Sequence, residues 1–473
     1  MKVKHQELLI SEEAPFQNCK LEREPYARIL TDVVNTYADG FVLAISNEWG
    51  TGKTTFVKMW RQQLKNEGFE TIYFNAWEND FDNAPLVAIM SELATLTNKG
   101  NKEVFKSVVT KGSILVKNIA PAVMKALVKR YIGDLGDVNL EAVENATKAS
   151  SEILEQEIKE YTSKKKTIID FRKELEKFVN QGQPKKPLVF IVDELDRCRP
   201  NYAIEVLEQI KHFFSVSGIV FVLSIDKKHL SSSVKGFYGS EQIDSEEYLR
   251  RFIDLEYSIP KPTTKAFINY LFDYYDFKAF FSAKERLQYN EHRNDQHNFL
   301  SFAEFLLTKS NSTLRQQERI FSLTRLVLCS FKLNEYTFSP LFFFLIYVKV
   351  MDGDLFGKIE RNELTLQELS DCYGKILSSE SLTLQTINIS YVEALLIFFY
   401  NNNREYQNRD ELLQRNEIGG IIDVVLSNVT KDKESLGSYF EDIEKRDYRS
   451  LSLSFLLKRI TLTEPMEIQS PTI

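Results

Sequence analysis

The sequence predicts an α/β protein: a core with a parallel sheet, a helical insertion within that core, and an all-helical C-terminal domain. Buried strands are indicated by short apolar runs that end in polar residues, at Ser46, Asp193 and Asp226. Helical periodicity follows each run, as in a parallel sheet whose strands are connected by helices. The indicated boundaries are 1–96 and 181–262 for the core, 97–180 for the insertion and 263–473 for the helical domain.

Composition and charge place the 473-residue chain among ordinary soluble proteins, with 43% hydrophobic and 27% charged residues. The net charge of −7 excludes a protein that coats nucleic acid over its whole surface, but it leaves room for a local basic patch. The four cysteines share neither a metal-ligand spacing nor a pairing pattern, which fits a reducing cytoplasm. Met1 to Leu21 is too polar for a signal peptide, and the apolar run Leu341 to Val348 is far shorter than the roughly 20 residues of a membrane span.

The core is organised around a loop that follows the first apolar run, Phe41 to Ile45. This loop leads into a helical pattern, and it consists of Asn47, Glu48, Trp49, Gly50, Thr51, Gly52, Lys53, Thr54 and Thr55. Strand, tight loop and helix N-terminus in this order are what a triphosphate-binding loop requires, because backbone N–H groups and the helix dipole then face the phosphate oxygens. Lys53 can reach the β- and γ-phosphates, and the Thr54 hydroxyl can complete the shell of a Mg²⁺ ion.

One position of this loop departs from the pattern G-x-x-x-x-G-K-[ST]. Asn47 stands where the pattern has its first glycine. Because asparagine tolerates positive φ better than other non-glycine residues, we expect Asn47 to replace that glycine at positive φ and the turn to survive. Gly50 and Gly52 supply the close approach of the backbone. The alternative is an ordinary strand–turn–helix with a chance Gly-x-Gly-Lys-Thr, and the downstream motifs weaken it.

The elements on either side of the loop complete the first half of the core. Tyr26 to Tyr37 has apolar residues at helical spacing and predicts a helix, which in this position either lies near an adenine base or only packs. Thr71 to Asn75 predicts a second strand. A helix follows from Pro85 to about Leu96, with the proline as its first residue.

The predicted insertion begins with a basic stretch. Lys99 to Arg130 contains seven lysines and one arginine against a single acid, Glu103, with apolar residues threaded among them. One interpretation is a basic amphipathic arm for an acidic surface, either anionic lipid headgroups or nucleic-acid phosphates. The other is a helical segment packed on the core with a solvated lysine face. A long helical pattern then runs from Asp137 to about Asn180.

The second half of the core opens on a buried strand, Pro187 to Glu194, that ends in two carboxylates. Carboxylates at the C-terminal end of a parallel strand point into the crevice where ligands bind. Asp193 is therefore predicted to hold the Mg²⁺ through water, and Glu194 to polarise the attacking water. A plain buried strand seldom ends in Asp-Glu-Leu-Asp-Arg, because unpaired buried carboxylates are costly.

A further buried strand, Gly218 to Asp226, has polar residues at its tip. Ser224 or Asp226 is predicted to lie next to the γ-phosphate, where ATPases with an extra strand between the two phosphate-site strands carry a residue that reports hydrolysis. The alternative role is a helix cap. A helix is predicted before this strand, from Asn201 to Phe214, and the core closes with a short strand, Leu255 to Ile259.

The rest of the chain is helical in pattern and rich in Phe, Tyr and Leu. Its densest apolar run, Pro340 to Val348, predicts a buried core helix. Arg315 and Arg319 lie one helical turn apart and therefore share a face. That spacing suits a pair that reaches back to phosphates, although surface arginines at i and i+4 are common.

Together these motifs resemble those of the KAP family of P-loop NTPases. The segments that carry the resemblance are Glu48 to Thr54, Phe74 to Trp77, Asp193 to Pro200, Phe221 to Asp226, Tyr248 to Arg251, and the pair Arg315 and Arg319. They occur in the family's order over residues 22–320. Three features depart from the family: Asn47 in the loop, Glu194 where aspartate is common, and a lysine-rich stretch where many members have membrane-spanning helices, which lysines make costly.

The resemblance implies an additional-strand ATPase core that binds ATP and Mg²⁺, with a helical insertion between the Walker A loop and the Walker B strand. It implies that Arg251 acts as an arginine finger, in cis or from a neighbouring subunit. It also implies that Arg315 senses the γ-phosphate from the helical domain. Prokaryotic relatives are associated with resistance to phage.

The function that we predict is a Mg²⁺-dependent ATPase that serves as a conformational switch or assembly platform, with a protein partner or as a homo-oligomer. The alternatives are a nucleic-acid-engaged motor or sensor and a membrane-surface scaffold, each using Lys99 to Arg130. The predicted location is the cytoplasm, with peripheral membrane association as a variant. A small-molecule kinase is disfavoured because nothing resembles a substrate lid, and GTP because no Asn-Lys-x-Asp follows a suitable strand.

Overall fold

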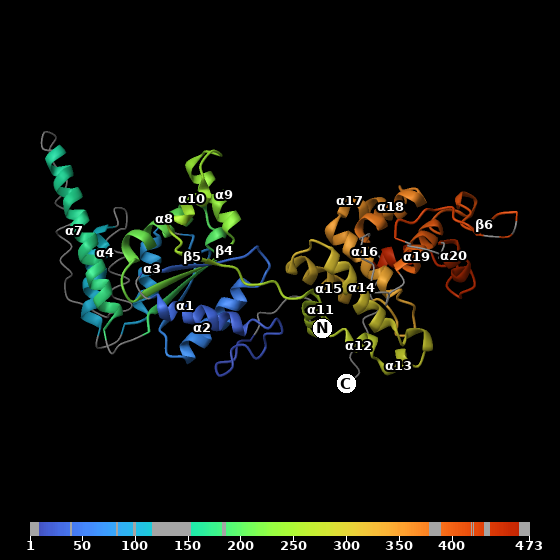
Figure 1. Cartoon of the computed structure of the whole chain (residues 1–473), viewed down its shortest axis with the longest axis horizontal. Coiled ribbons are helices and arrows are strands. Elements are labelled where there is room, and N and C mark those ends of the chain that lie inside the picture. Colours follow the sequence, from blue (N-terminus) through green and yellow to red (C-terminus); the bar gives the residue numbers. More distant parts are fainter. Residues whose placement is uncertain are drawn as a thin grey trace. The chain divides into compact units, whose positions relative to one another are not determined.

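The computed structural model describes residues 9–37, 40–81, 84–97, 101–115, 153–181, 186–377, 389–417, 419, 421–429 and 436–462. The chain divides into two compact units, one of Leu8–Lys261 and one that contains Pro262–Ile473 (Figure 1). The first unit contains the five-stranded sheet, the predicted phosphate loop and the carboxylates predicted to face it. Across the described residues, no helix combines the length and the apolar character that crossing a bilayer requires.

The first unit alternates strands and helices in the order that the sequence predicts. Its elements are α1 (Glu24–Thr36), β1 (Val42–Ser46), α2 (Lys53–Asn66), β2 (Thr71–Asn75), α3 (Pro85–Ala94), α4 (Lys102–Leu115), α7 (Ile153–Val179), β3 (Leu188–Asp193), η1 (Leu195–Arg197), α8 (Pro200–Gln209), η2 (Ile210–Phe214), β4 (Ile219–Ile225), α9 (Lys227–Tyr238), α10 (Ser245–Arg250) and β5 (Leu255–Tyr257). Pro85 begins α3 as predicted, because the first turn of a helix needs no N–H donor from it.

The five strands of the sheet run parallel in the order β2-β3-β4-β1-β5. β4 therefore lies between β1, which leads into the loop, and β3, which ends at Asp193, so the predicted extra strand is confirmed. The register places Asn75 beside Asp193 and Asp193 beside Ser224. Because the strands are parallel, their polar ends gather at one edge of the sheet, where ligands bind in open α/β folds.

The three central strands β1, β3 and β4 are buried on both faces, which is why they read as apolar runs. Leu43 and Ile45 of β1 pack in one core with α1 and α2, whereas the alternate residues of the strand pack in a second core with α3 and α8 (Figure 1). Trp60 of α2 is fully buried and donates its indole N–H to the hydroxyl of Thr31 on α1 at 3.0 Å. This bond fixes α2, and with it the loop that precedes α2, against α1.

The described part of the predicted insertion consists of α4 and α7, which pack against each other and against the core. Phe105 and Val108 of α4 are buried in the same cluster as Phe171 and Phe178 of α7, and the rings of Phe105 and Phe178 lie 4.9 Å apart. α4 forms part of the basic stretch from Lys99 to Arg130. The rest of that stretch after residue 115, and the start of the helix predicted from Asp137, lie outside the described residues.

The second unit is mainly helical. Its elements are α11 (Thr264–Tyr274), α12 (Lys278–Phe281), α13 (Lys284–Leu287), η3 (Asn290–His292), α14 (Asp295–Lys309), α15 (Leu314–Leu328), α16 (Ser339–Met351), α17 (Gly353–Glu360), α18 (Leu366–Leu377), α19 (Ile389–Asn401), η4 (Tyr406–Asn408), β6 (Gln414–Arg415), β7 (Ile421–Ile422), α20 (Leu436–Glu444) and α21 (Ser454–Ile460). Leu341 to Val348 of α16 are all buried, which confirms the predicted core helix. The antiparallel pair β6–β7 is an addition to the predicted all-helical pattern, because two residues per strand leave no periodicity to read.

Candidate functional site

The loop between β1 and α2 has the backbone of a phosphate-binding loop at two positions. Gly50 and Gly52 have φ values of 78° and 80°, in the left-handed region that favours glycine. Lys53 begins α2 directly after Gly52, and Thr54 and Thr55 lie half-buried in its first turn. The N-terminus of α2, with its unpaired N–H groups and the positive end of its dipole, therefore opens on the loop.

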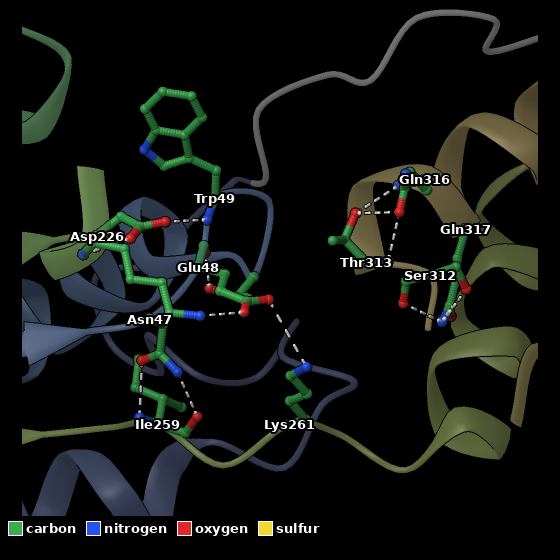
Figure 2. Close-up of polar contacts among 12 residues, drawn as sticks. Asn47, Glu48, Trp49, Asp226, Ile259, Lys261, Ser312, Thr313, Gln316 and Gln317 are labelled. Atoms are coloured by element: carbon green, nitrogen blue, oxygen red, sulfur yellow. Dashed lines mark hydrogen bonds and ion pairs between the residues drawn. The ribbon is translucent and has the colours of Figure 1, made fainter. Parts of the chain in front are cut away.

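Asn47 does not adopt the positive φ expected of it, since it is not among the described non-glycine residues with positive φ. Its side-chain amide instead bonds to the main chain of Ile259, just after β5. Nδ2 donates to the Ile259 carbonyl at 2.9 Å, and Oδ1 accepts the Ile259 N–H at 2.9 Å (Figure 2). Glycine has no side chain to make these bonds. Asn47 therefore ties the start of the loop to the edge of the sheet, which accounts for its departure from the usual pattern.

We expect replacement of Asn47 by alanine to lower the free energy of unfolding by about 1–3 kcal/mol, because the N–H and carbonyl of Ile259 lose their partners. Glycine, the residue of the usual pattern, should be no better, since it also lacks the amide and adds backbone freedom to the unfolded chain. Asn47→Asp keeps the acceptor and should fall between alanine and wild type. Urea unfolding of the three variants measures the effect, and an Asn47→Gly protein more stable than wild type contradicts this role.

The Lys53 side chain lies inside the loop, with 9% of the residue's surface exposed. Its Nζ donates to the carbonyl oxygens of Asn47 at 2.5 Å and Glu48 at 3.2 Å. Burial lowers the pKa of Lys53, and the charges of three aspartates, led by Asp196, oppose that shift. One of the three is Asp193, so the loop lysine and the carboxylate that ends β3 interact electrostatically. The two motifs therefore meet at one site.

Asp193 is almost fully buried, and each of its oxygens has a donor. Tyr73 of β2 donates its hydroxyl to Oδ2 at 2.8 Å, and the N–H of Glu194 donates to Oδ1 at 3.0 Å. The hydroxyl of Ser224, beside Asp193 in the register, is buried without a hydrogen-bond partner in the described part of the chain. Carboxylate and hydroxyl oxygens are the ligands that Mg²⁺ prefers. Asp193 and Thr54 carry oxygens of these two kinds, and their role as Mg²⁺ ligands stays a prediction.

Glu194, the predicted general base, is held by two neighbours. Its Oε1 pairs with Nη1 of Arg197 at 2.8 Å, and its Oε2 accepts a hydrogen bond from the amide of Asn75 at 3.3 Å. Burial raises the pKa of Glu194, and the charge of Arg197 opposes that rise. The φ of Glu194 is 60°, which is uncommon for a residue other than glycine, and such strained positions concentrate at functional sites.

A cluster at the tip of β4 connects the loop to α9. Asp226 caps α9 by accepting the N–H of Lys228 at 3.1 Å, and the same carboxylate accepts the N–H of Trp49 at 3.1 Å (Figure 2). The Trp49 ring stacks on the ring of His229, with centroids 3.6 Å apart, and its indole N–H donates to Asp196. Of the two roles considered for Asp226, the helix cap is confirmed. Contact with the γ-phosphate stays a prediction.

The two arginines predicted to act on the phosphates are exposed. Arg251 directly follows α10 in the first unit. Arg315 lies in the first turn of α15 in the second unit, one turn before Arg319. Their roles as arginine finger and γ-phosphate sensor stay predictions.

Some residues of the site were not assigned a role from the sequence. Asn75 had a usable signal: a polar residue that ends a predicted parallel strand is expected at the same sheet edge as Asp193. Arg197 had one too, because it lies within the segment Asp193 to Pro200 and three residues after Glu194, whereas His229 had none. Arg23 had none either, since its hydrogen bonds to the loop join residues 28 and 29 positions apart.

Residues 23–326 match the model of a protein family, described as the KAP family P-loop domain. The matched range begins at Arg23 and ends within α15, so it covers the loop, the carboxylates and Arg315. A search of curated proteins found no match to the chain.

Proposed function

The chain belongs to the KAP family of P-loop NTPases, and from that premise we propose that its site binds ATP with Mg²⁺ and hydrolyses it. The observation that carries the proposal is the meeting of the glycine-bearing loop, the buried Lys53 and the carboxylate Asp193 at one edge of a parallel sheet. ATP is proposed rather than GTP because the sequence lacks an Asn-Lys-x-Asp after a suitable strand.

The loop and the first turn of α2 would bind the phosphates. Their N–H groups and the helix dipole favour an anion. Lys53 would exchange its neutral carbonyl partners for charged phosphate oxygens, and a hydrogen bond between two charged groups is the stronger one. Trp49 would keep its backbone N–H on Asp226, so the loop retains its connection to α9.

The carboxylates would serve the metal and the water. Asp193 and Thr54 would hold the Mg²⁺, which neutralises charge on the phosphates as the bond to the γ-phosphate breaks. Glu194 would take a proton from the attacking water. Its neighbour Arg197 favours the ionised carboxylate that this step needs, and the amide of Asn75 fixes the direction of the second oxygen.

We further propose that ATP binding and hydrolysis switch the protein between two conformations or assembly states. Support comes from the exposed position of Arg315 at the start of α15, a helix that the family match reaches. Arg251 would act as an arginine finger, in cis or in a homo-oligomer, and a protein partner would respond to the state of the switch. A role in anti-phage defence is a proposal that rests on the family resemblance alone.

The described part of the basic stretch favours the packing interpretation over a separate binding function. α4 buries Phe105 and Val108 in the core cluster that also contains Phe171 of α7. Buried aromatic and aliphatic side chains are what a packed helix requires, so we propose no nucleic-acid or membrane function for α4. Residues 116–130 of the stretch lie outside the described residues.

Phosphate release by the purified full-length chain tests the proposal. We expect turnover of ATP with Mg²⁺, a fall to background when EDTA removes the metal, and recovery when Mg²⁺ is returned in excess. GTP should be turned over more slowly. A chain that binds no ATP in the presence of Mg²⁺ contradicts the proposed site, and a chain that binds ATP without turnover contradicts the hydrolysis.

A further inference from the structure

The loop has a second support that comes from outside it. Arg23, the residue directly before α1, is buried with 4% of its surface exposed. Its Nη2 donates to the carbonyl of Thr51 at 2.7 Å, and its Nη1 donates to the carbonyl of Gly52 at 3.2 Å. One planar guanidinium thus holds two consecutive carbonyls of the loop.

Burial of the charged Arg23 side chain costs free energy, and a role in the loop explains why it is buried there. Its Nε is buried without a hydrogen-bond partner in the described part of the chain, and burial lowers the pKa of the guanidinium. Its two hydrogen bonds go to neutral carbonyls, and no described carboxylate pairs with it. A buried charge of this kind is unfavourable, and it lies here beside the positive end of the α2 dipole. An anion bound in the loop supplies the missing negative charge.

The two hydrogen bonds also fix where the loop's donors point. A trans peptide is planar, with its carbonyl and its N–H directed to opposite sides. Because Arg23 holds the carbonyls of Thr51 and Gly52, the N–H groups of Gly52 and Lys53 are directed away from Arg23. Gly52 permits this approach, since a Cβ atom there would lie 3.0 Å from Nη1 of Arg23.

We propose that Arg23 is a positioning residue of the phosphate site. It orients the N–H groups of Gly52 and Lys53 toward the bound phosphates and adds a buried positive charge behind them. The identity of the anion as a nucleoside triphosphate rests on the proposed function. The ordering of the loop by Arg23 does not, because it can be measured without nucleotide.

The test compares Arg23→Met, which keeps the length of the side chain, with Arg23→Lys, which keeps the charge but offers a single nitrogen. Arg28→Met is the matched control, because Arg28 lies in α1, five residues after Arg23, with its side chain 70% exposed, and pairs with Glu24. The readouts are amide hydrogen exchange of the loop without nucleotide, the Kd for ATP with Mg²⁺, and kcat at saturating ATP.

We expect Arg23→Met to speed exchange at residues 49–53 and to raise the Kd for ATP roughly 10- to 100-fold, since two charge-assisted hydrogen bonds are lost. The value of kcat should change less than the Kd, because Glu194 and Asp193 are untouched. Arg23→Lys should recover part of the affinity. Near-UV circular dichroism and slow exchange in β3 and β4 check that the core has folded.

Unchanged loop exchange and an unchanged Kd in a folded Arg23→Met protein overturn the proposal. If that variant does not fold, Arg23→Lys decides: exchange and Kd equal to wild type overturn it, and intermediate values support it. A wild-type chain that binds no ATP defeats the proposed function instead, and the exchange experiment still decides whether Arg23 orders the loop.

Discussion

Lys53→Ala is expected to lose almost all ATP turnover, with kcat/KM falling on the order of 10²–10³-fold, the effect of removing one preorganised donor from the site of developing charge. The buried Nζ donates to two loop carbonyls, and the charges of three aspartates oppose the fall in the pKa of Lys53 that burial causes. Alanine removes that cation and leaves the aspartates to repel the incoming phosphates. Phosphate release with Mg²⁺ and ATP, together with a direct measurement of ATP binding, gives the effect.

Two further variants make this result specific. Lys65 is exposed in the last turn of the same helix, so Lys65→Ala should keep wild-type turnover. Lys53→Arg keeps the charge, but the larger guanidinium does not fit a position with 9% exposure, so it should also be impaired. A folded Lys53→Ala protein with turnover near that of wild type places the phosphate site elsewhere.

Sequence patterns predicted the parts of the fold that depend on local chemistry. Thr71–Asn75 forms the predicted strand, because its short, mostly buried run turns polar at Asn75, where the strand ends. The same reasoning placed Asp193 at a strand end, whereas the position of β4 between the two strands of the phosphate site was expected from the resemblance to additional-strand ATPases. Apolar runs and polar residues at strand ends can be recognised in the sequence without knowing which segments pack together.

Contacts between distant segments could not be predicted in this way. Asn47 was expected to replace glycine through its backbone, yet it replaces it through a side-chain bond to a residue 212 positions away. Arg23 likewise acts through partners 28 and 29 positions away, which hydrophobic periodicity cannot reveal because it indicates which face is buried and not which group packs on it. The loop itself was therefore predictable from its residues, whereas its supports were not.

Glu194→Gln is expected to separate ATP binding from hydrolysis. Glutamine keeps the shape of the side chain and can still accept a hydrogen bond from Asn75, but it cannot take a proton from water or form an ion pair with Arg197. Loss of the general base should lower kcat by roughly 10²–10⁴-fold. The Kd for ATP should stay close to the wild-type value, because the loop, Lys53 and Asp193 are unchanged.

Single-turnover hydrolysis and equilibrium binding measure the two effects separately. Glu205→Gln on α8 is the matched control, since burial also raises the pKa of Glu205, and its carboxylate is not part of the site. That variant should hydrolyse ATP as wild type does. Wild-type turnover in Glu194→Gln means that another group activates the water, and lost binding means that Glu194 serves the nucleotide instead. If the variant binds ATP but does not hydrolyse it, it accumulates the ATP-bound state. A partner of the proposed switch should remain bound longest in that state.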